Sequence, residues 1–457
     1  MLDMADLVAE TWDKDMVWCK NGVYDYHVAD PDKRFTPYCL DDGKPNPDYY
    51  ERYGDMIITR KLAVDYVENA PLVTYHNDAD DTDWNVVDGI RELFDDPTLM
   101  YFAWQILHFC ARQYNGGASI FAINRTGQAG GGGGKDTFAN LMIGLLGGPG
   151  RVYRTPLEKW ERNDHELEGI VGKMGWISSE SNAPTQPVDD CEAWKNCCRG
   201  QAISINAKYK AVTSYVFHGI MFQMSNDVPM FRERSKSVYR CAECLPFEKD
   251  FHKGVPRDYI RDDYALRKET LEYVLFHALT MFDNQALDSY TEDVRKYVEP
   301  IKMDMRATAS KVWEYMDEIE PMLINWMEAD KKIQLQSYPD ARFRIPYKFL
   351  YDVFADDKVG WCRKMGYGHV LNAKNFLREL QVWADAHKDK WRFLSTKDKA
   401  FRINVLSNWN EILKEYPVYD WLNQRYRAGL PYENILPTMG NLDKFGKPFN
   451  GGIEYIG

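Results

Sequence analysis

The feature that most constrains the fold is a run of five glycines that ends in a lysine, within the segment "RTGQAGGGGGKDTFANLMIGLL". A short apolar run, residues 117–124, precedes the glycines and has the character of a strand. After them, Phe138, Leu141, Met142 and Leu145 recur at helical spacing. Strand, glycine loop and helix form the context that a phosphate-binding loop requires, because loop amides and a helix N-terminus then face the anion.

The lysine and its neighbours predict a loop that holds the phosphates of ATP. Lys135 is expected to reach the β- and γ-phosphates, while the glycines let backbone N–H groups turn inward. A flexible spacer is the alternative, but such spacers normally join domains and have polar flanks. The predicted nucleotide-binding residues are Ala129, Gly130, Gly131, Gly132, Gly133, Gly134, Lys135, Asp136 and Thr137.

The position after the lysine is expected to hold Mg²⁺. Phosphate loops usually place a hydroxyl residue there, whereas this chain has Asp136 followed by Thr137. A carboxylate is also a hard oxygen donor for Mg²⁺. The sequence does not decide between Asp136 and Thr137 as the metal ligand.

Three residues downstream complete the expected catalytic set with Lys135. Glu180 follows the apolar run 174–179 and is expected to hold the metal and polarise water. Asn226 follows the run 215–225 and is expected to position that water. Arg240 is expected to reach the ATP of a neighbouring subunit. Each has a simpler alternative: a surface glutamate, an Asn-Asp turn and a surface arginine.

Composition excludes several classes of protein. The 457 residues carry a net charge of −12, which disfavours a wholly basic DNA-coating protein but permits a local basic surface. No run of about 18 apolar residues predicts a membrane span, and the acidic N-terminus does not resemble a secretory signal. Nine scattered cysteines indicate reduced thiols and a cytoplasmic location. The CxxC spacing at 241–244 has no second ligand pair nearby, so we expect a strand there.

Longer motifs along the chain support a resemblance to a known family. They are "KNGVYDYHVADPDKRFTPY", "YGDMIITRKLAVDYVENAP", "AGGGGGKDTF", "LEGIVGKMGWISSESN", "WKNCCRGQAISINAKYKAVTSYVFHGIMFQMSNDVPMF", "RERSKSVYRCAECLPFEKDF" and "IPYKFLYDVFADDKVGWCRKMGYGHVLNAKNFLREL". Together they resemble superfamily 3 helicases of the phage and plasmid primase-helicase type, related to the poxvirus primase-helicase. That family usually has Ser or Thr after the lysine, so Asp136 is a departure from its pattern.

The resemblance implies an AAA+-like α/β P-loop ATPase core that forms a hexameric ring. It implies ATP-driven movement on single-stranded DNA, during replication of a phage, virus or mobile element in the host cytoplasm. Lys208 and Lys210 would lie on a hairpin in the ring channel and contact DNA. Arg240 would act on the neighbouring subunit, with Arg232 and Arg234 as weaker candidates. For the two lysines, a solvated turn is the alternative.

The resemblance also suggests a division of the chain. The expected regions are an N-terminal collar and oligomerisation region of α+β or helical character (1–112), the ATPase core (113–262), a helical lid (263–338), a winged-helix-like DNA-binding module (339–426) and an extended tail (427–457). In that module Lys364, Lys374 and Arg378 are the candidates for DNA contact, against the alternative of a solvated face. No primase-polymerase segment precedes the "NGV" motif in the given sequence, so we expect either that this sequence is a piece of a longer chain or that a primase or polymerase partner is a separate chain.

Two other functions remain open from the sequence. The first is a replication initiator or loader that uses ATP as a switch and binds DNA without unwinding it. The second is a ring subunit that assembles without ATP turnover, which Asp136 and the lack of an acidic residue before Glu180 would suit.

Overall fold

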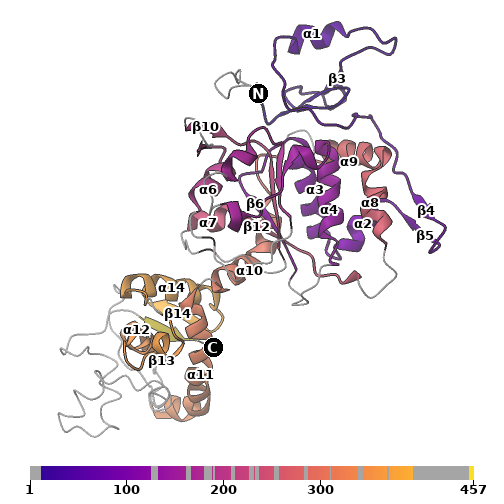
Figure 1. Cartoon of the computed structure of the whole chain (residues 1–457). Helices are drawn as coiled ribbons and strands as arrows, with labels where there is room; N and C mark the ends of the chain where they lie inside the picture. Colours follow the sequence, from indigo (N-terminus) through magenta and orange to yellow (C-terminus); the bar gives the residue numbers. More distant parts are fainter. Residues whose placement is uncertain are drawn as a thin grey trace. The chain divides into compact units, whose positions relative to one another are not determined.

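The structure is a computed structural model that describes residues 12–124, 132–160, 166–179, 188, 191–206, 212–225, 231, 236–251, 257–282, 287–308, 310–337, 343–367, 370–394 and 452–456. The chain forms two compact units, Met1–Met305 and Arg306–Gly457 (Figure 1). Each unit is described by itself below.

A five-stranded parallel sheet forms the centre of the first unit. Its strand order is β12-β6-β11-β8-β7. Every residue of the five strands is buried, as expected for a parallel sheet that is covered on both faces. The strands are β6 (Ser119–Ile123), β7 (Val152–Tyr153), β8 (Gly175–Ile177), β11 (Ile220–Ser225) and β12 (Ala242–Pro246). Such a sheet with flanking helices is consistent with the predicted P-loop-like α/β core.

The order of the strands predicts where a ligand binds. After β6 the chain moves to the far edge at β7 and returns through β8 and β11, and it then crosses to the other side of β6 with β12. In open α/β sheets, ligands bind at the carboxyl ends of the strands where the strand order reverses. That point is the carboxyl end of β6, where the glycine loop begins.

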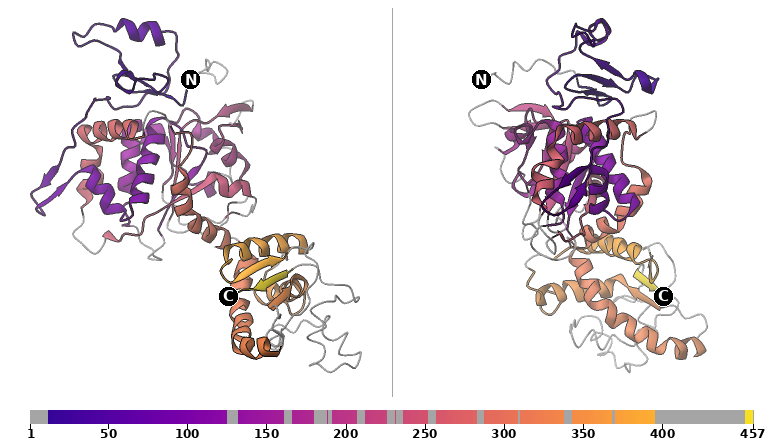
Figure 2. Two further views of the ribbon diagram at one scale, coloured as in Figure 1. Left: turned by 180° about the vertical axis from the view of Figure 1, so that it is seen from behind. Right: turned by 90° about the vertical axis from the view of Figure 1, so that its right-hand side faces the viewer.

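Helices cover one face of the sheet and share a core with the N-terminal region. Figures 1 and 2 show α3, α4 and α9 side by side on this face. Side chains cap two of the N-termini: Asn85 accepts from the amide of Asp88, and Asp96 accepts from the amide of Thr98. The helices are α2 (Val86–Leu93), α3 (Pro97–Ala111), α4 (Lys135–Leu146), α8 (Asp258–Asp262) and α9 (Lys268–Thr280).

One hydrophobic cluster runs from Val17 through this layer to Val298. The boundary expected at 112/113 therefore lies inside a continuous core. The N-terminal part adds a three-stranded antiparallel sheet and a two-stranded hairpin. Its elements are β1 (Met16–Trp18), β2 (Gly22–Asp25), β3 (Phe35–Pro37), α1 (Pro47–Tyr53), β4 (Tyr75–Asn77) and β5 (Thr82–Trp84).

The other face of the sheet has a second cluster, which includes Phe121 and Trp176. Its elements are α5 (Leu157–Trp160), α6 (Glu192–Cys198), β9 (Ala202–Ile205), β10 (Thr213–Val216) and α7 (Lys236–Cys241). The strand expected for the CxxC segment is confirmed for Cys244, which lies in β12, and is wrong for Cys241, which is the last residue of α7. Among the described residues, the one cluster with metal-ligand spacing is Asp13, Asp15 and His27.

The helical region expected at 263–338 is divided between the two units. Helix α9 packs on α3 in the first unit, whereas α11 (Lys311–Ser337) belongs to the second. Helix α10 (Glu292–Thr308) contains the boundary. Helical periodicity predicts a helix but not the body that it packs against, which explains the difference.

The second unit combines helices with an antiparallel sheet of order β13-β15-β14. Its remaining elements are β13 (Phe343–Pro346), α12 (Tyr347–Ala355), α13 (Trp361–Lys364), α14 (Ala373–Ala386), β14 (Trp391–Leu394) and β15 (Gly452–Tyr455). The sequence separates the expected tail, 427–457, from the winged-helix-like module, but β15 is the central strand of that module's sheet. A four-residue strand between glycines has too little local pattern to reveal its partners.

Candidate nucleotide-binding site

The described end of the glycine loop leads directly into α4. Gly134 is the N-cap of this helix, with φ at +84°, and no side chain caps it. The amide groups of an uncapped first turn remain available as donors for an anion, and the helix dipole favours negative charge there. The local geometry is therefore that of a phosphate-binding helix start.

Close packing and backbone conformation explain why position 134 needs glycine. A Cβ atom on Gly134 would lie 2.2 Å from the Cδ2 atom of Leu93, and the left-handed backbone is also costly for other residues. The carbonyl of Gly132 accepts a hydrogen bond from the amide of Phe251 at 3.0 Å. The loop thus lies between the end of α2 and the segment after β12.

Lys135 lies at the sheet edge where its predicted role requires it. Only 4% of its surface is exposed, and its Nζ donates to the backbone carbonyl of Ser225 at 2.8 Å. Ser225 is the last residue of β11, the strand next to β6. A buried ammonium group at the carboxyl edge would supply positive charge to an anion at the start of α4.

Asp136 and Thr137 both line the adjoining cavity. Burial lowers the pKa of Arg154, and the carboxylate of Asp136 opposes that shift. The pKa of Arg261 is raised, mainly by its hydrogen bond with Asp262, and Asp136 adds to the effect. A carboxylate and a hydroxyl are hard oxygen donors, so these two residues fit Mg²⁺.

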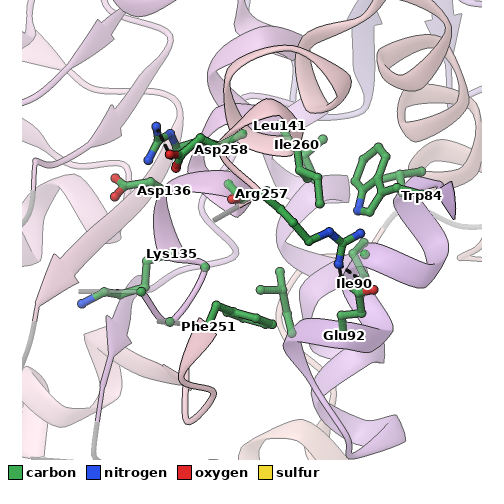
Figure 3. Close-up of a pocket in the computed structure, with 18 of the residues that line it drawn as sticks. Trp84, Ile90, Glu92, Lys135, Asp136, Leu141, Phe251, Arg257, Asp258 and Ile260 are labelled. Atoms are coloured by element: carbon green, nitrogen blue, oxygen red, sulfur yellow. Dashed lines mark hydrogen bonds and ion pairs between the residues drawn. The ribbon is translucent and has the colours of Figure 1, made fainter. Parts of the chain in front are cut away.

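A cavity of about 700 Å³ extends from this helix start (Figure 3). Its polar end is lined by residues 132–137. Apolar side chains line much of the rest, beginning with Leu93 and Phe251 beside Gly134; the others are Trp84, Val86, Ile90, Leu141 and Ile260. Arg257 lines the cavity and reaches toward Glu92, where its Nη1 donates to the two carboxylate oxygens at 3.2 and 3.1 Å (Figure 3).

Several predicted site residues lie outside the described residues. They are Ala129, Gly130, Gly131, Glu180, Lys208, Lys210, Asn226, Arg232 and Arg234. The strands before Glu180 and Asn226, β8 and β11, are parallel neighbours in the sheet that contains β6. Strands β9 and β10, on either side of the two lysines, pair antiparallel with Ile205 opposite Thr213. The roles of these residues stay predictions.

Arg240 lies near the amino ends of the parallel strands, whereas the glycine loop follows the carboxyl end of β6. It is exposed and lies in α7, which ends just before β12. Ala242 of β12 is paired with Ser119 at the amino end of the parallel strand β6. A five-residue strand spans about 16 Å, so Arg240 is distant from the loop of its own chain. The predicted role toward a neighbouring subunit is untested.

The sequence did not reveal the apolar end of the cavity. Trp84 and Glu92 fall within the collar expected at 1–112, yet they line the cavity together with Phe251 and Arg257. Val86, Ile90 and Leu93 have helical spacing, which marks a buried face but not the partner of that face. No sequence signal connects these residues to the glycine loop.

The helices of the described residues include none that is long and apolar enough to cross a membrane.

Comparison with protein-family models and with curated proteins finds no match. Among solved structures, the chain is similar to the NrS-1 C-terminal region (residues 305–718), with 13% identity and a TM-score of 0.39, over 63% of this chain and 67% of that one. Another structure of that region has 12% identity and a TM-score of 0.38, over 77% and 87%. JCV helicase has 16% identity and a TM-score of 0.26, over 52% and 64%. These values are too low to carry an argument about this chain.

Proposed function

We propose that the protein is an ATP-dependent DNA helicase or translocase that moves on single-stranded DNA during replication of a phage, virus or mobile element. The observation that carries the proposal is the position of Lys135. It is buried beside an uncapped helix start, at the carboxyl edge of a parallel sheet and next to a cavity of about 700 Å³. This arrangement supports triphosphate binding, and the motif order supports the helicase assignment.

In this proposal the chain's own residues divide the work. Lys135 and the loop amides bind the phosphates, and Asp136 or Thr137 holds Mg²⁺, which would neutralise phosphate charge. Glu180 takes a proton from the attacking water, and Asn226 orients that water. Because Arg240 is distant from its own loop, it can stabilise transition-state charge only in a neighbouring subunit. This geometry favours a ring, for which a homohexamer is proposed.

The proposed DNA contacts involve two surfaces. Lys208 and Lys210, between β9 and β10, would follow the DNA backbone in the ring channel, and phosphate contacts of this kind carry little sequence information. The second surface is the exposed basic face of the winged-helix-like module, with Lys364, Lys374 and Arg378. A separate primase or polymerase chain is the further proposed partner.

The first test is ATP hydrolysis with Mg²⁺, with and without single-stranded DNA. We expect DNA to stimulate turnover, and Lys135→Ala to reduce it by at least about 100-fold, the scale seen when a preorganised donor is removed. Lys173→Ala is the matched control, because Lys173 also donates to a backbone carbonyl, that of Gly150, but is exposed and outside the cavity. Equal turnover in the two variants would refute the phosphate-loop assignment.

A second candidate is an ATP-switched initiator or loader that binds DNA without unwinding it. Helix α14 favours it, because Lys374 and Arg378 are exposed one turn apart on this helix and Lys364 is exposed on α13. Sequence-specific duplex binding that Lys374→Ala with Arg378→Ala abolishes, without DNA-stimulated turnover by the unmodified protein, would support this function over the helicase.

A further inference from the structure

The apolar end of the cavity is shaped by one face of α2. Val86, Ile90 and Leu93 line it at helical spacing. Leu93 lies against Gly134, so the chamber starts at the phosphate end, and the seven-residue rise to Val86 extends it by about 10 Å. Phe251 and Ile260 line it from other segments (Figure 3). A flat apolar group linked to a bound triphosphate fits this chamber.

Gly89 positions an indole ring at the far end. A Cβ atom on Gly89 would lie 2.6 Å from Nε1 of Trp84, so the ring packs directly on the backbone of α2. Trp84 is 3% exposed and lines the cavity. No described residue accepts a hydrogen bond from its N–H group. An indole donor without a partner in a cavity wall is suited to an acceptor on a ligand.

Arg257 is a second donor in the wall of the chamber, and a network fixes its position. Its Nη1 donates to Glu92 of α2, and its Nε donates to the hydroxyl of Tyr259 at 3.2 Å. That hydroxyl donates to Asp80 in the β4–β5 turn at 2.8 Å. The network thus connects α2, α8 and the β4–β5 hairpin around the chamber. Arg257 is preorganised in the cavity wall to which Trp84 also belongs, with guanidinium donors beyond those used by Glu92 and Tyr259.

We infer that this chamber is a purine-selective nucleobase site, in which Ile90, Ile260 and Phe251 contact the faces of the base while the Trp84 indole and Arg257 donate to its ring-nitrogen or carbonyl acceptors. The inference rests on the proposed triphosphate site and extends it to the base. A purine has two fused rings and therefore buries more apolar surface in the chamber than a pyrimidine does. The favourable free energy of binding increases with the apolar area removed from water. Selection of the base therefore depends on the N-terminal region as well as on the segments that follow β12.

Titration calorimetry with Mg²⁺ tests the inference in the full chain, using ATP, GTP, CTP, UTP and inorganic tripolyphosphate. We expect the purine nucleotides to bind at least about tenfold more tightly than tripolyphosphate and more tightly than the pyrimidine nucleotides. Phe251→Ala should weaken ATP binding about tenfold and leave tripolyphosphate binding within about twofold. Phe251 is 41% exposed, so its removal does not open the core. Trp84→Phe, which keeps a ring but loses the donor, should weaken purine binding by about threefold to tenfold.

Two further variants separate this inference from the proposed function. Tyr50→Ala removes another exposed aromatic ring, on α1, and should change neither ligand's affinity. Lys135→Ala should weaken ATP and tripolyphosphate alike, and unchanged affinity for both would refute the phosphate site itself. If Lys135→Ala behaves as expected but Phe251→Ala leaves ATP affinity unchanged, or pyrimidine nucleotides bind as tightly as purine ones, the base site is refuted while the phosphate site stands.

Discussion

At the start of α4, Gly134 is constrained both by its backbone conformation and by close packing. Gly134 adopts a left-handed conformation, and a Cβ atom added to it would lie 2.2 Å from Cδ2 of Leu93, so the leucine side chain would have to move. Gly117 also has a left-handed φ, +80°, but a Cβ atom added to it would have no other atom within 4 Å. Comparison of the two glycines therefore separates conformational strain from close packing.

We expect Gly134→Ala to destabilise the first unit more than Gly117→Ala does. Both variants should lose about 1 kcal/mol or more from the left-handed backbone. Gly134→Ala should lose roughly 1–3 kcal/mol in addition, since it forces overpacking against Leu93. Urea unfolding followed by circular dichroism measures the difference. Equal losses would show that the approach of Leu93 does not constrain the loop.

In the first unit, a buried histidine of α3, His108, connects this helix with α9. Nδ1 of His108 lies 2.9 Å from the carbonyl of Ala278, and Nε2 lies 3.2 Å from Nη1 of Arg112. Since the carbonyl can only accept and the guanidinium can only donate, Nδ1 carries the proton and the ring is neutral. Burial, with Arg112 adding to it, lowers the pKa of His108 to about 3.

Because of His108, we expect the folded state to become less stable in mild acid. The unfolded imidazole gains a proton below its ordinary pKa of about 6.5, whereas the folded ring stays neutral down to about 3. Its contribution to stability is therefore complete above pH 6.5 and decreases as the pH falls, by about 2 kcal/mol at pH 5. His108→Gln should lower stability at pH 7 but flatten the decline between pH 7 and pH 5, as measured by urea unfolding.

The matched control for that experiment is His76→Gln. His76 is exposed, and its hydrogen bond with Asp83 raises its pKa. Its linkage has the opposite sign, because the folded state binds the proton more tightly than the unfolded state does. The control should not flatten the acid-induced decline. A decline of unchanged steepness in His108→Gln would contradict the neutral, buried state of His108.

The whole molecule consists of two units, and the last described strand completes the second one. Strand β15 pairs with both β13 and β14, and these two pair with no other described strand. Glu454, 1% exposed, forms an ion pair with Arg392 of β14. The C-terminal residues therefore bear on the fold of residues more than a hundred positions earlier.

A chain that ends at Asn450 should lose the folded structure of the second unit but keep triphosphate binding in the first. Limited proteolysis should cleave residues 311–394 rapidly in this variant, while calorimetry should show tripolyphosphate affinity within twofold of the full chain. A chain that ends at Tyr455 keeps β15 and serves as the control. Equal protease resistance of the two truncated chains would show that β15 is dispensable.

Local patterns were sufficient for the helix and strand around the glycine loop. Phe138, Leu141, Met142 and Leu145 recur at helical spacing because one side of α4 is buried, and all four are buried in the structure. The run before the loop is apolar from Ile120 to Ile123 because β6 is covered on both faces. Local backbone preference and burial pattern, which act over a few residues, therefore carry the prediction of a phosphate loop.

Contacts between segments that are distant in the sequence determine the chamber, the position of Arg240 and the pairing of β15. The chamber joins Trp84, Phe251 and Arg257, the edge occupied by Arg240 depends on strand order, and β15 joins β13 across more than a hundred residues. A hydrophobic pattern states that a face is buried but not against what, since burial of apolar surface is non-directional. The lysine and its loop could thus be identified in the sequence, whereas the surroundings that would select a base exist only once the chain has folded.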